Sequence, residues 1–463
     1  MSITAAELDP YLIEKYNVIG PYYTSYPAVS HWSKDFSNKD FVTSFKNSFE
    51  KNKKFPLSIY THFPFCAKLC YFCICHMQVT NNRDKIEKFL TYFLKEIDMF
   101  RRLLDDHSLV PDVREIHFGG GSPTHLDREQ FDRLVEHLEK IVKFRDLSEC
   151  ALEIDIRTIK KEDLAYYHSK GINRISFGVQ DFNPKVQEAI NRVQPLESFL
   201  EILTPDVRER FHGINFDLIY GMPRQTVESF HETIEIVKSL NPDRLAVYNY
   251  CHNPQSYKHQ RIFQEDELPS EGERTKMYVE TVQNLLESGY ERIGIDHFAK
   301  STDTLSIAKR DKTLHRSFIG YTVGRTDNLI SMGPSALSDF SFCYAQNVYE
   351  NSDYYKALDK NTFPLFRGYI MKPDDIIRRE IMNKLLCHFS LDFKEIEEKH
   401  KIEMKKYFAR ELCGFGELIK DSLMELNNDG IKITPLGEFF VRHVCMVFDK
   451  YSPNQHVLSV ANK

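Results

Sequence analysis

The chain has 463 residues, of which 42% are hydrophobic, and its formal net charge at pH 7 is −6. This composition predicts a packed globular core and excludes a wholly disordered chain, and the negative charge disfavours non-specific binding to nucleic acid. The opening residues lack the basic start and apolar stretch of a secretory signal, and no run approaches the about 20 apolar residues of a membrane helix, so we expect a cytoplasmic protein that binds neither nucleic acid nor membrane.

The first predicted segment, residues 1–55, is polar and irregular and is interpreted as an N-terminal arm or lid. From residue 57 onward, short runs rich in apolar and β-branched residues predict buried strands, with amphipathic stretches of helical spacing between them. The strands are expected at 57–63, 115–121, 151–156, 174–180, 214–221, 244–250 and 291–298, and two of the helices at 85–104 and 128–144. Strands separated by helices pair in parallel through right-handed crossovers, which predicts a partial or complete parallel (β/α) barrel over 56–310, with a doubly wound open sheet as the alternative.

The alternation of strands and helices fades after about residue 300, and we interpret 311–375 as a connecting segment that packs on the barrel. The last predicted domain, 376–463, is mostly helical. Its helical patterns lie at 375–389, 393–400 and 405–421, and a hairpin-like stretch follows at 424–437 with its turn at Asn428–Gly430. Helices followed by a small hairpin resemble a winged helix. We expect a lid or scaffold, because no basic recognition helix is apparent.

The cysteines Cys66, Cys70 and Cys73 have the spacing C-x₃-C-x₂-C and directly follow a predicted strand. We therefore expect them on a loop at the carboxyl edge of the sheet, where α/β barrels carry their active sites. Three soft thiolates suit a [4Fe–4S] cluster and leave one iron without a protein ligand, which indicates a reactive cluster. A zinc knuckle is the alternative, but no second cysteine pair lies at a suitable distance and His76 is too close to Cys73. Cys75 is expected to support the cluster without binding it.

Glycine and polar residues mark the ends of several other predicted strands. The triplet in EIHFGGGSPTHL, 115–126, could bring a backbone close to a ligand and expose its N–H groups, with a tight turn as the equal alternative. Charged or amide side chains at strand ends are costly in a core and indicate a ligand, although a helix cap or a loop ion pair is the alternative for each. These side chains belong to Glu153, Asp155, Gln180, Asp181 and Asp217. Arg192 could bind a carboxylate through two N–H groups, or be an ordinary surface arginine.

The cysteine motif, with the aromatic Phe72 before its third cysteine, is similar to the signature of the radical S-adenosylmethionine (SAM) superfamily. Within it, the chain resembles the oxygen-independent coproporphyrinogen III oxidases over nearly its whole length. The resemblance is carried by IEKYNVIGPYYTSYP, GGGSPTHL, ISFGVQDFNPKVQ, NFDLIYGMPRQT, LNPDRLAVYNY, DHFA, HRSFIGYT and CYAQN. The chain has Ile74, Ile156 and Ile319 where that family usually has glycine, proline and glutamine.

The resemblance implies a chemistry. A reduced cluster on the three cysteines would split SAM into methionine and a 5′-deoxyadenosyl radical, which would take a hydrogen atom from a propionate of coproporphyrinogen III. Loss of carbon dioxide and one electron would leave a vinyl group, and two rounds would give protoporphyrinogen IX for haem biosynthesis. The enzyme would need a reducing electron donor and is expected to be a monomer.

The resemblance also implies two bound SAM molecules. The first would be held by Tyr60, Gly120, Glu153 and Leu337, of which Tyr60 and Glu153 would be the catalytic residues. The second would be held by Phe72, Gly121, Ser122, Gln180, Arg192, Asp217 and Cys251. The alternatives are a diverged radical SAM enzyme on the same scaffold, a methyltransferase or haem-modifying enzyme, which Ile319 favours, and a haem-binding chaperone. Such chaperones carry a late histidine–tryptophan motif, whereas the only tryptophan here is Trp32.

Overall fold

The computed structural model describes residues 10–16, 20–50, 52–323 and 328–451. Residues 1–9, 17–19 and 51 of the predicted arm lie outside them. The chain divides into two compact units. We call the unit of Ser33–Met277 and Gly324–Ile370 the barrel unit, and the unit of Met1–Trp32, Tyr278–Val323 and Met371–Lys463 the C-terminal unit. The segment bounds expected at residues 55, 310 and 375 stay predictions. Within the described ranges, no helix is long and apolar enough to cross a membrane.

The barrel unit is built on a sheet whose strands follow the order β16-β15-β14-β13-β1-β4-β5-β6-β7-β8. From β13 to β8 the neighbours pair in parallel, and β13 to β16 pair antiparallel. The strands are β1 (Lys54–Phe63), β4 (Val110–Gly120), β5 (Glu149–Ile154), β6 (Arg174–Gln180), β7 (Gly213–Tyr220), β8 (Arg244–Asn249), β13 (Leu329–Met332), β14 (Leu337–Phe340), β15 (Cys343–Asn347) and β16 (Leu365–Ile370). The predicted parallel α/β architecture is confirmed.

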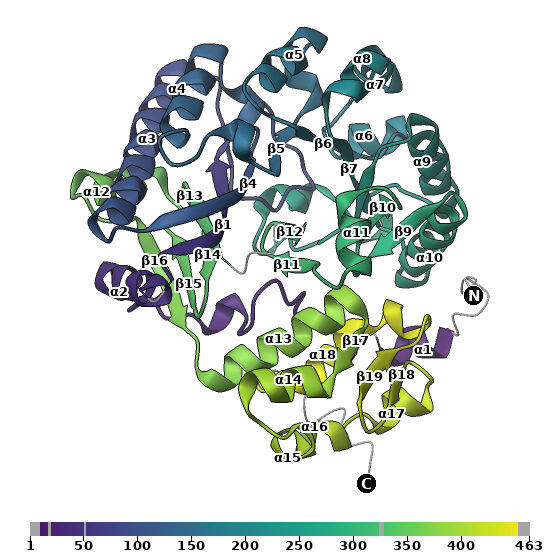
Figure 1. Cartoon of the computed structure of the whole chain (residues 1–463). Helices are drawn as coiled ribbons and strands as arrows, with labels where there is room; N and C mark the ends of the chain where they lie inside the picture. The colour runs from purple at the N-terminus through teal and green to yellow at the C-terminus, as the bar shows by residue number, and fades with distance from the viewer. Residues whose placement is uncertain (1–9, 17–19, 51, 324–327, 452–463) are drawn as a thin grey trace. The chain divides into compact units, whose positions relative to one another are not determined.

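Helices cover the outer side of this curved sheet. Figure 1 shows α3, α4, α5, α7, α8 and α9 outside the strands. The helices of the unit are α2 (Asn38–Phe49), α3 (Arg83–Asp106), α4 (Arg128–Leu138), α5 (Lys161–Ser169), α6 (Pro184–Ala189), α7 (Leu196–Ile202), α8 (Pro205–Arg210), α9 (Val227–Leu240) and α12 (Asn351–Asp359). In α3, Ile86, Phe89 and Phe93 are buried at a spacing of three and four residues, and the Asn82 side chain caps the helix by accepting from the Lys85 N–H at 3.0 Å.

The C-terminal unit corrects one predicted strand. Residues 291–298 form two antiparallel strands, β9 (Tyr290–Ile293) and β10 (His297–Lys300), and not one. The chain reverses at Gly294, whose φ is +57° and whose place no side chain could take, because a Cβ there would overlap the ring of Tyr321. A second hairpin, β11 (His315–Ser317) and β12 (Gly320–Thr322), carries Ile319 in its turn.

The remaining elements of this unit agree with the predicted helical domain. The helices are α1 (Pro10–Lys15), α10 (Glu271–Glu287), which spans the boundary between the units, α11 (Thr304–Arg310), α13 (Pro373–His388), α14 (Phe393–His400), α15 (Met404–Tyr407), α16 (Ala409–Cys413), α17 (Gly416–Lys420) and α18 (Val441–Phe448). The expected hairpin is β18 (Met424–Leu426) and β19 (Gly430–Ile433), and its turn is closed by Asn427 Oδ1, which accepts from the Asp429 and Gly430 N–H groups. A third strand, β17 (Ser390–Asp392), pairs with β19 and was not predicted.

Candidate functional site

The cysteine loop begins where β1 ends, as the sequence predicts. Cys66 lies in the short strand β2 (Phe65–Cys66), which pairs with β3 (Gln78–Val79), and this pair closes a loop that carries Cys70 and Cys73. The Gln78 N–H donates to Pro64 O at 2.7 Å and the Thr80 N–H donates to Cys66 O at 3.1 Å. The three sulfurs are therefore held on one closed loop at the carboxyl edge of the parallel strands.

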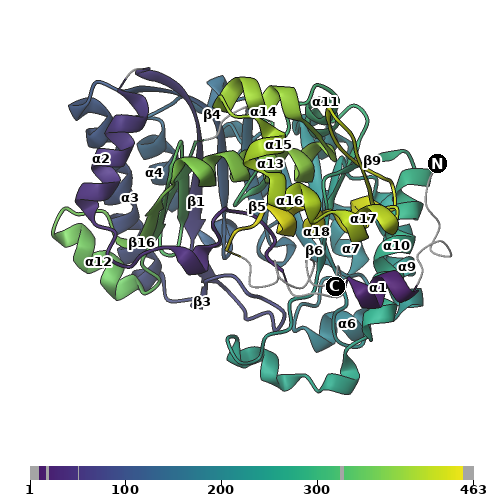
Figure 2. The ribbon, with the colours of Figure 1, turned by 90° about the horizontal axis from the view of Figure 1, so that it is seen from below.

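Residues far along the chain fix the backbone of this loop. His259 Nε2 donates to Cys73 O at 2.7 Å, and the buried Gln260 donates through Nε2 to Phe72 O at 3.3 Å and to Cys251 O at 3.0 Å. Both side chains belong to the short helix η6 (Lys258–Ile262) in the segment after β8, which Figure 2 shows on the side of the barrel unit where β3 and α6 lie. One amide thus joins Phe72 and Cys251, two residues assigned to the same cofactor molecule. The sequence gives no sign of either contact.

The sulfurs influence one another electrostatically. Burial and the neighbouring Cys73 and Cys70 raise the pKa of Cys66 to about 12. A hydrogen bond from the exposed Cys75 lowers the pKa of Cys73 to about 7. Among the described residues, no three His, Cys, Asp or Glu side chains converge closely enough to hold a single metal ion.

Two arginines and a carboxylate surround Cys70. Asp155 follows β5 and forms ion pairs with Arg157 at 2.6 Å and Arg192 at 3.3 Å. Although burial opposes ionisation, Arg192 and Arg157 hold the pKa of Asp155 at about 2. Both guanidinium groups also reach Cys70 Sγ, at 3.4 and 3.5 Å. Arg192 is thus a buried residue whose carboxylate partner lies within the protein, and Arg157 is a site residue that the sequence analysis missed.

Glu153 and Tyr60 lie on neighbouring parts of the same edge. Glu153 Oε1 accepts from His117 Nε2 at 2.8 Å, and Oε2 accepts from the Gly120 N–H at 3.2 Å. Burial lowers the pKa of His117, but the hydrogen bond and charge of Glu153 outweigh it and raise that pKa. The ring of Tyr60 lies 5.7 Å from that of His117, centroid to centroid. His117 therefore orients the Glu153 carboxylate, a role that the isolated motif HFGGG did not indicate.

A histidine sets the orientation of the Tyr60 hydroxyl. His62 Nε2 is 2.9 Å from His76 O, which requires that nitrogen to donate, and burial lowers the pKa of His62 to about 4. The ring is thus neutral, its Nδ1 is an acceptor, and the Tyr60 hydroxyl, 3.3 Å away, donates to it. Leu337 joins this group from the other side of β1. Its carbonyl accepts from Ser331 Oγ at 2.5 Å, and Ser331 is paired in register with Tyr60.

The glycine triplet packs tightly against β1 and the cysteine loop. A Cβ on Gly120, whose φ is +109°, would lie 2.8 Å from His62 Nδ1, and one on Gly121 would lie 2.7 Å from Phe65 O. The Gly121 N–H donates to Phe63 O at 2.6 Å, and the Ser122 N–H donates to Phe65 O at 2.8 Å. These N–H groups are therefore bonded within the protein, contrary to the expectation that the triplet exposes them. The glycines are needed for the close approach of β4 to the cysteine loop.

Gln180 combines an unfavourable backbone conformation with an unpaired buried acceptor. It ends β6 with a φ of +66°, which is unfavourable for a residue with a side chain, and its buried Oε1 has no hydrogen-bond partner in the described part of the chain. Gly178 leaves room for the amide, because a Cβ there would lie 2.8 Å from Gln180 Nε2. A buried acceptor left unpaired costs about 1–3 kcal/mol, so a donor on a bound ligand would be favoured here.

The two other acidic residues differ in their surroundings. Asp217, in the middle of β7, accepts from Ser176 Oγ at 3.1 Å and Asn215 Nδ2 at 2.8 Å, and it stays half-buried. Asp181 is fully buried and accepts from Gln225 at 2.6 Å and from Thr233 at 2.9 Å. Asp181 therefore joins the end of β6 to α9 through neutral hydrogen-bond donors, which is neither the helix cap nor the loop ion pair that was its alternative.

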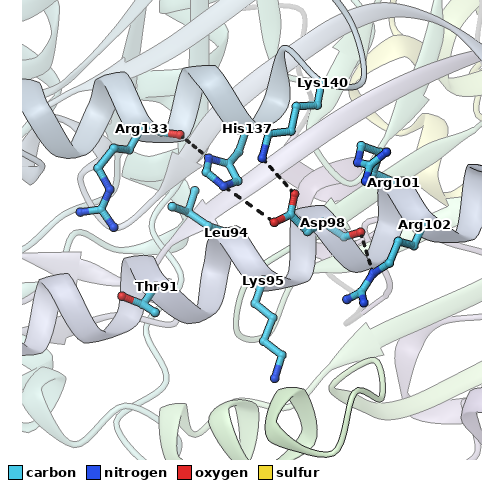
Figure 3. Close-up of a pocket in the computed structure, with 9 residues that line it drawn as sticks. All are labelled: Thr91, Leu94, Lys95, Asp98, Arg101, Arg102, Arg133, His137 and Lys140. Atoms are coloured by element: carbon cyan, nitrogen blue, oxygen red, sulfur yellow. Dashed lines mark hydrogen bonds and ion pairs between the residues drawn. The ribbon is translucent and has the colours of Figure 1, made fainter.

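A large cleft of the barrel unit lies away from these residues. About 620 Å³ in volume, it runs between α3 and α4 and is lined by Thr91, Leu94, Lys95, Asp98, Arg101, Arg102, Arg133, His137 and Lys140. Figure 3 shows Asp98 between His137 and Lys140, with Lys140 Nζ 3.3 Å from the carboxylate. The basic side chains are thus partly neutralised by neighbouring carboxylates. None of the predicted site residues lines this cleft, and we interpret it as a solvated helix surface.

Comparisons with known proteins agree with this arrangement. A family model described as the radical SAM superfamily matches residues 60–237, and one described as the HemN C-terminal domain matches residues 371–440. The oxygen-independent coproporphyrinogen III oxidase of Escherichia coli K12 is 40% identical over 452 residues, 97% of each chain. The protein of that name from Synechocystis sp. is 37% identical over 97% of this chain and 96% of the relative. The solved structure of the Escherichia coli coproporphyrinogen III oxidase, described as a radical SAM enzyme, has a TM-score of 0.89 at 40% identity and covers 96% of this chain and 99% of its own.

Proposed function

The chain belongs to the family of oxygen-independent coproporphyrinogen III oxidases, which are radical SAM enzymes, and from this premise we propose how its own residues serve the reaction. The protein oxidises coproporphyrinogen III without oxygen, as a step of haem biosynthesis. It does so with a [4Fe–4S] cluster and SAM. When bound, these two groups supply the one-electron chemistry that removes a hydrogen atom from a propionate side chain of the substrate.

One cluster is held by Cys66, Cys70 and Cys73. The donor set fits the group, because three cysteines on one loop offer the soft ligands that iron–sulfur clusters take, and burial with the neighbouring Cys73 and Cys70 raises the pKa of Cys66 unless positive charge compensates them. Arg157 and Arg192, which both reach Cys70, supply part of that charge. Cys75 stays outside the ligand set and donates a hydrogen bond to Cys73.

The first SAM is bound by Tyr60, Gly120, Glu153 and Leu337. The observation that carries this proposal is the Glu153 carboxylate, which His117 and the Gly120 N–H hold in place while 37% of its side chain stays exposed. An oriented, accessible carboxylate can accept from the amine or the ribose hydroxyls of SAM. Tyr60 lies at the same edge, and its hydroxyl is held by His62 Nδ1 at 3.3 Å.

A second SAM is bound by Phe72, Gly121, Ser122, Gln180, Arg192, Asp217 and Cys251. The free acceptor of Gln180 and the half-buried Asp217 support this assignment. The engagement of Arg192 with Asp155 and Gly178 O indicates that Arg192 lines this site without supplying a free guanidinium group. Equilibrium dialysis of the reconstituted enzyme is expected to give two SAM per chain, and Gln180→Ala is expected to reduce this to one. A wild-type value of one would contradict the second site.

The proposal is tested on anaerobically reconstituted protein. We expect about four irons and four sulfides per chain, lost in Cys70→Ala and retained in the neighbouring control Cys75→Ala. Glu153→Ala is expected to keep the cluster and to lose 5′-deoxyadenosine formation from SAM in the presence of a reductant. Wild-type yields from Glu153→Ala would make that residue structural. The enzyme needs an external electron donor, and we propose that it acts as a monomer.

Ile319 distinguishes this enzyme from the usual pattern of its family. It lies half-buried in the turn between β11 and β12, and its N–H is 3.4 Å from Ser317 Oγ. An amide side chain there would add hydrogen bonds worth on the order of 1 kcal/mol, which corresponds to about a tenfold rate difference at most. We expect Ile319→Gln to raise the yield of vinyl product, measured by liquid chromatography. Deoxyadenosine without vinyl product from either protein would mean that the substrate is a different one.

A further inference from the structure

We infer that Arg157 is a positioning residue that tunes the cluster: its hydrogen bond to Cys70 Sγ makes the cluster easier to reduce. The inference rests on the proposed function, because it takes Cys70 as a cluster ligand. Neither the cysteine motif nor the SAM-binding residues include Arg157. Its place is the short helix η5 (Ile156–Thr158), immediately after β5, at the edge where the cysteine loop lies.

The guanidinium group of Arg157 is fixed through all three of its nitrogen atoms. Nε donates to Asp155 Oδ1 at 2.9 Å and Nη2 donates to Asp155 Oδ2 at 2.6 Å, which is the two-pronged geometry that makes Arg–carboxylate pairs specific. Nη1 donates to Asn191 O at 3.3 Å, and Asn191 in turn donates to Leu69 O at 2.7 Å, next to Cys70. Nη2 also donates to Cys70 Sγ at 3.4 Å. The group is therefore preorganised toward this sulfur.

Arg192 approaches the same sulfur from another element. Its Nη1 lies 3.3 Å from Asp155 Oδ2 and 3.5 Å from Cys70 Sγ, while Nε and Nη2 donate to Gly178 O at 3.0 and 2.8 Å. Two guanidinium groups and one carboxylate thus leave one net positive charge beside Cys70. The side chains of Arg192, Asp155 and Arg157 are only 9%, 14% and 17% exposed, so water screens that charge weakly.

Reduction adds an electron to the cluster and its thiolate ligands. N–H donors and positive charge beside a ligand sulfur stabilise the reduced state more than the oxidised state, and so raise the reduction potential. The effect is largest where the surroundings exclude water. Removing the Arg157 donor should therefore lower the potential, without removing a ligand.

The test is an EPR-monitored reductive titration of reconstituted holoenzyme without SAM, after iron and sulfide have been counted. We expect Arg157→Gln to keep the cluster and to lower its affinity for the electron about tenfold, which is 59 mV for a one-electron couple. Arg157→Lys keeps the positive charge but loses the two-pronged geometry of the guanidinium group. Its reduction potential should lie between those of Arg157→Gln and the wild type. Arg128→Gln is the matched control: Arg128 is an arginine of the same unit, 57% exposed and paired with Asp163, and its loss should leave the potential unchanged.

An unchanged potential in Arg157→Gln with a full complement of iron would overturn the inference. If Arg157→Gln loses its cluster, the reduction potential of Arg157→Lys is the test. A potential equal to that of the wild type would also overturn the inference, and a lower potential would support it. A wild-type protein that binds no iron would contradict the proposed function itself, which the iron count separates from a failure of Arg157.

Discussion

The two ends of β5 carry the same arrangement of charges with different surroundings. At its start, Glu149 lies between Arg174 and Arg244, which begin β6 and β8, at 2.9 and 3.1 Å. Just after its last residue, Asp155 lies between Arg157 and Arg192. At the first end all three partners begin regular strands. At the second end the arginines belong to a short helix and a loop. Each of them contacts Cys70 Sγ as well as the Asp155 carboxylate.

This difference indicates how one motif takes on two roles. The charges at the amino edge join three parallel strands. In α/β barrels the residues at this edge serve stability, whereas the active site lies at the carboxyl edge. At the carboxyl edge the same kind of triad adjoins the cysteine loop, where its donors are directed at a metal ligand. The pKa of Glu149 and that of Asp155 are both held at about 2, against burial, by their arginines. The chemistry of the triads is therefore alike, and the neighbours decide what each one does.

The largest expected effect breaks the amino-edge triad. Glu149→Gln should lower the free energy of unfolding by about 3 kcal/mol, because two arginines that are 6% and 7% exposed lose their shared carboxylate. Chemical denaturation of the anaerobic protein measures it, and folded protein should still bind a full cluster. Asp146→Asn, at an exposed carboxylate nearby, is the control and should change stability by less than about 0.5 kcal/mol. A loss of that small size in Glu149→Gln would contradict a stabilising role.

Glu96 is a buried carboxylate without an arginine partner. Its contribution to stability should depend on pH in the opposite sense to those of Glu149 and Asp155. Glu96 on α3 accepts from the Gly333 N–H, the Tyr354 hydroxyl and Asn347 Nδ2, but burial outweighs these donors and raises its pKa to about 7. The folded state therefore binds a proton that the unfolded state releases between about pH 4.5 and 7. Its contribution to stability is largest below that range and is lost as the pH rises through it.

We expect the unfolding free energy of the wild type to fall by about 2 kcal/mol more than that of Glu96→Gln between pH 5 and 8. Urea denaturation at four pH values measures this difference. Glu136→Gln, which changes an exposed residue of α4, should follow the wild type. Parallel curves for wild type and Glu96→Gln would mean that Glu96 stays ionised throughout.

At the carboxyl edge, Asp155→Asn should cost less stability than Glu149→Gln, about 1–2 kcal/mol, because Arg157 and Arg192 keep their backbone acceptors Asn191 O and Gly178 O. The same change removes a negative charge beside Cys70, so the reduction potential of the cluster should rise. Potentiometric titration therefore gives opposite signs for Asp155→Asn and Arg157→Gln. Equal signs would mean that geometry, and not charge, dominates at this end.

The smallest effect concerns acid. Because the pKa of Glu149 is depressed to about 2 from 4.5, its contribution is complete above about pH 4.5 and is lost as the pH falls toward 2. The wild type should therefore lose about 1 kcal/mol more than Glu149→Gln between pH 6 and 4. Denaturation midpoints at pH 6, 5 and 4 measure it, and a constant difference between the two proteins would contradict the assignment.

Much of the site could be predicted because its signals are local. The spacing of Cys66, Cys70 and Cys73 and the strand that precedes them are adjacent in sequence, and the strand at 174–180 was predicted with the bounds that β6 has. The four-residue strands β13 and β14 were missed, since runs as short as LISM carry too little periodicity. The sequence predicts one strand where β9 and β10 form a hairpin, because the turn at Gly294 lies between β-branched residues, Ile293 and Ile295, and carries no other turn signal.

Other parts could not be predicted because they depend on tertiary contacts. His117 meets Glu153 across two parallel strands, and Arg157 meets Cys70 over a separation of 87 residues. Nothing in the local sequence around either residue indicates its partner. The arginine that was singled out, Arg192, was expected to bind a ligand carboxylate, and the carboxylate it binds is Asp155.

The contacts from His259 and Gln260 to the cysteine loop have a consequence for how the enzyme is made. They join residues 186 and 188 positions apart. On the ribosome, the three thiols emerge long before the helix η6 that fixes Phe72 and Cys73. A nascent chain shorter than about 260 residues would thus offer cysteines on a loop that lacks its anchors. Iron delivered to such a chain would reach a cysteine loop that is not yet held in place. We therefore expect cluster assembly to follow synthesis of the chain through η6.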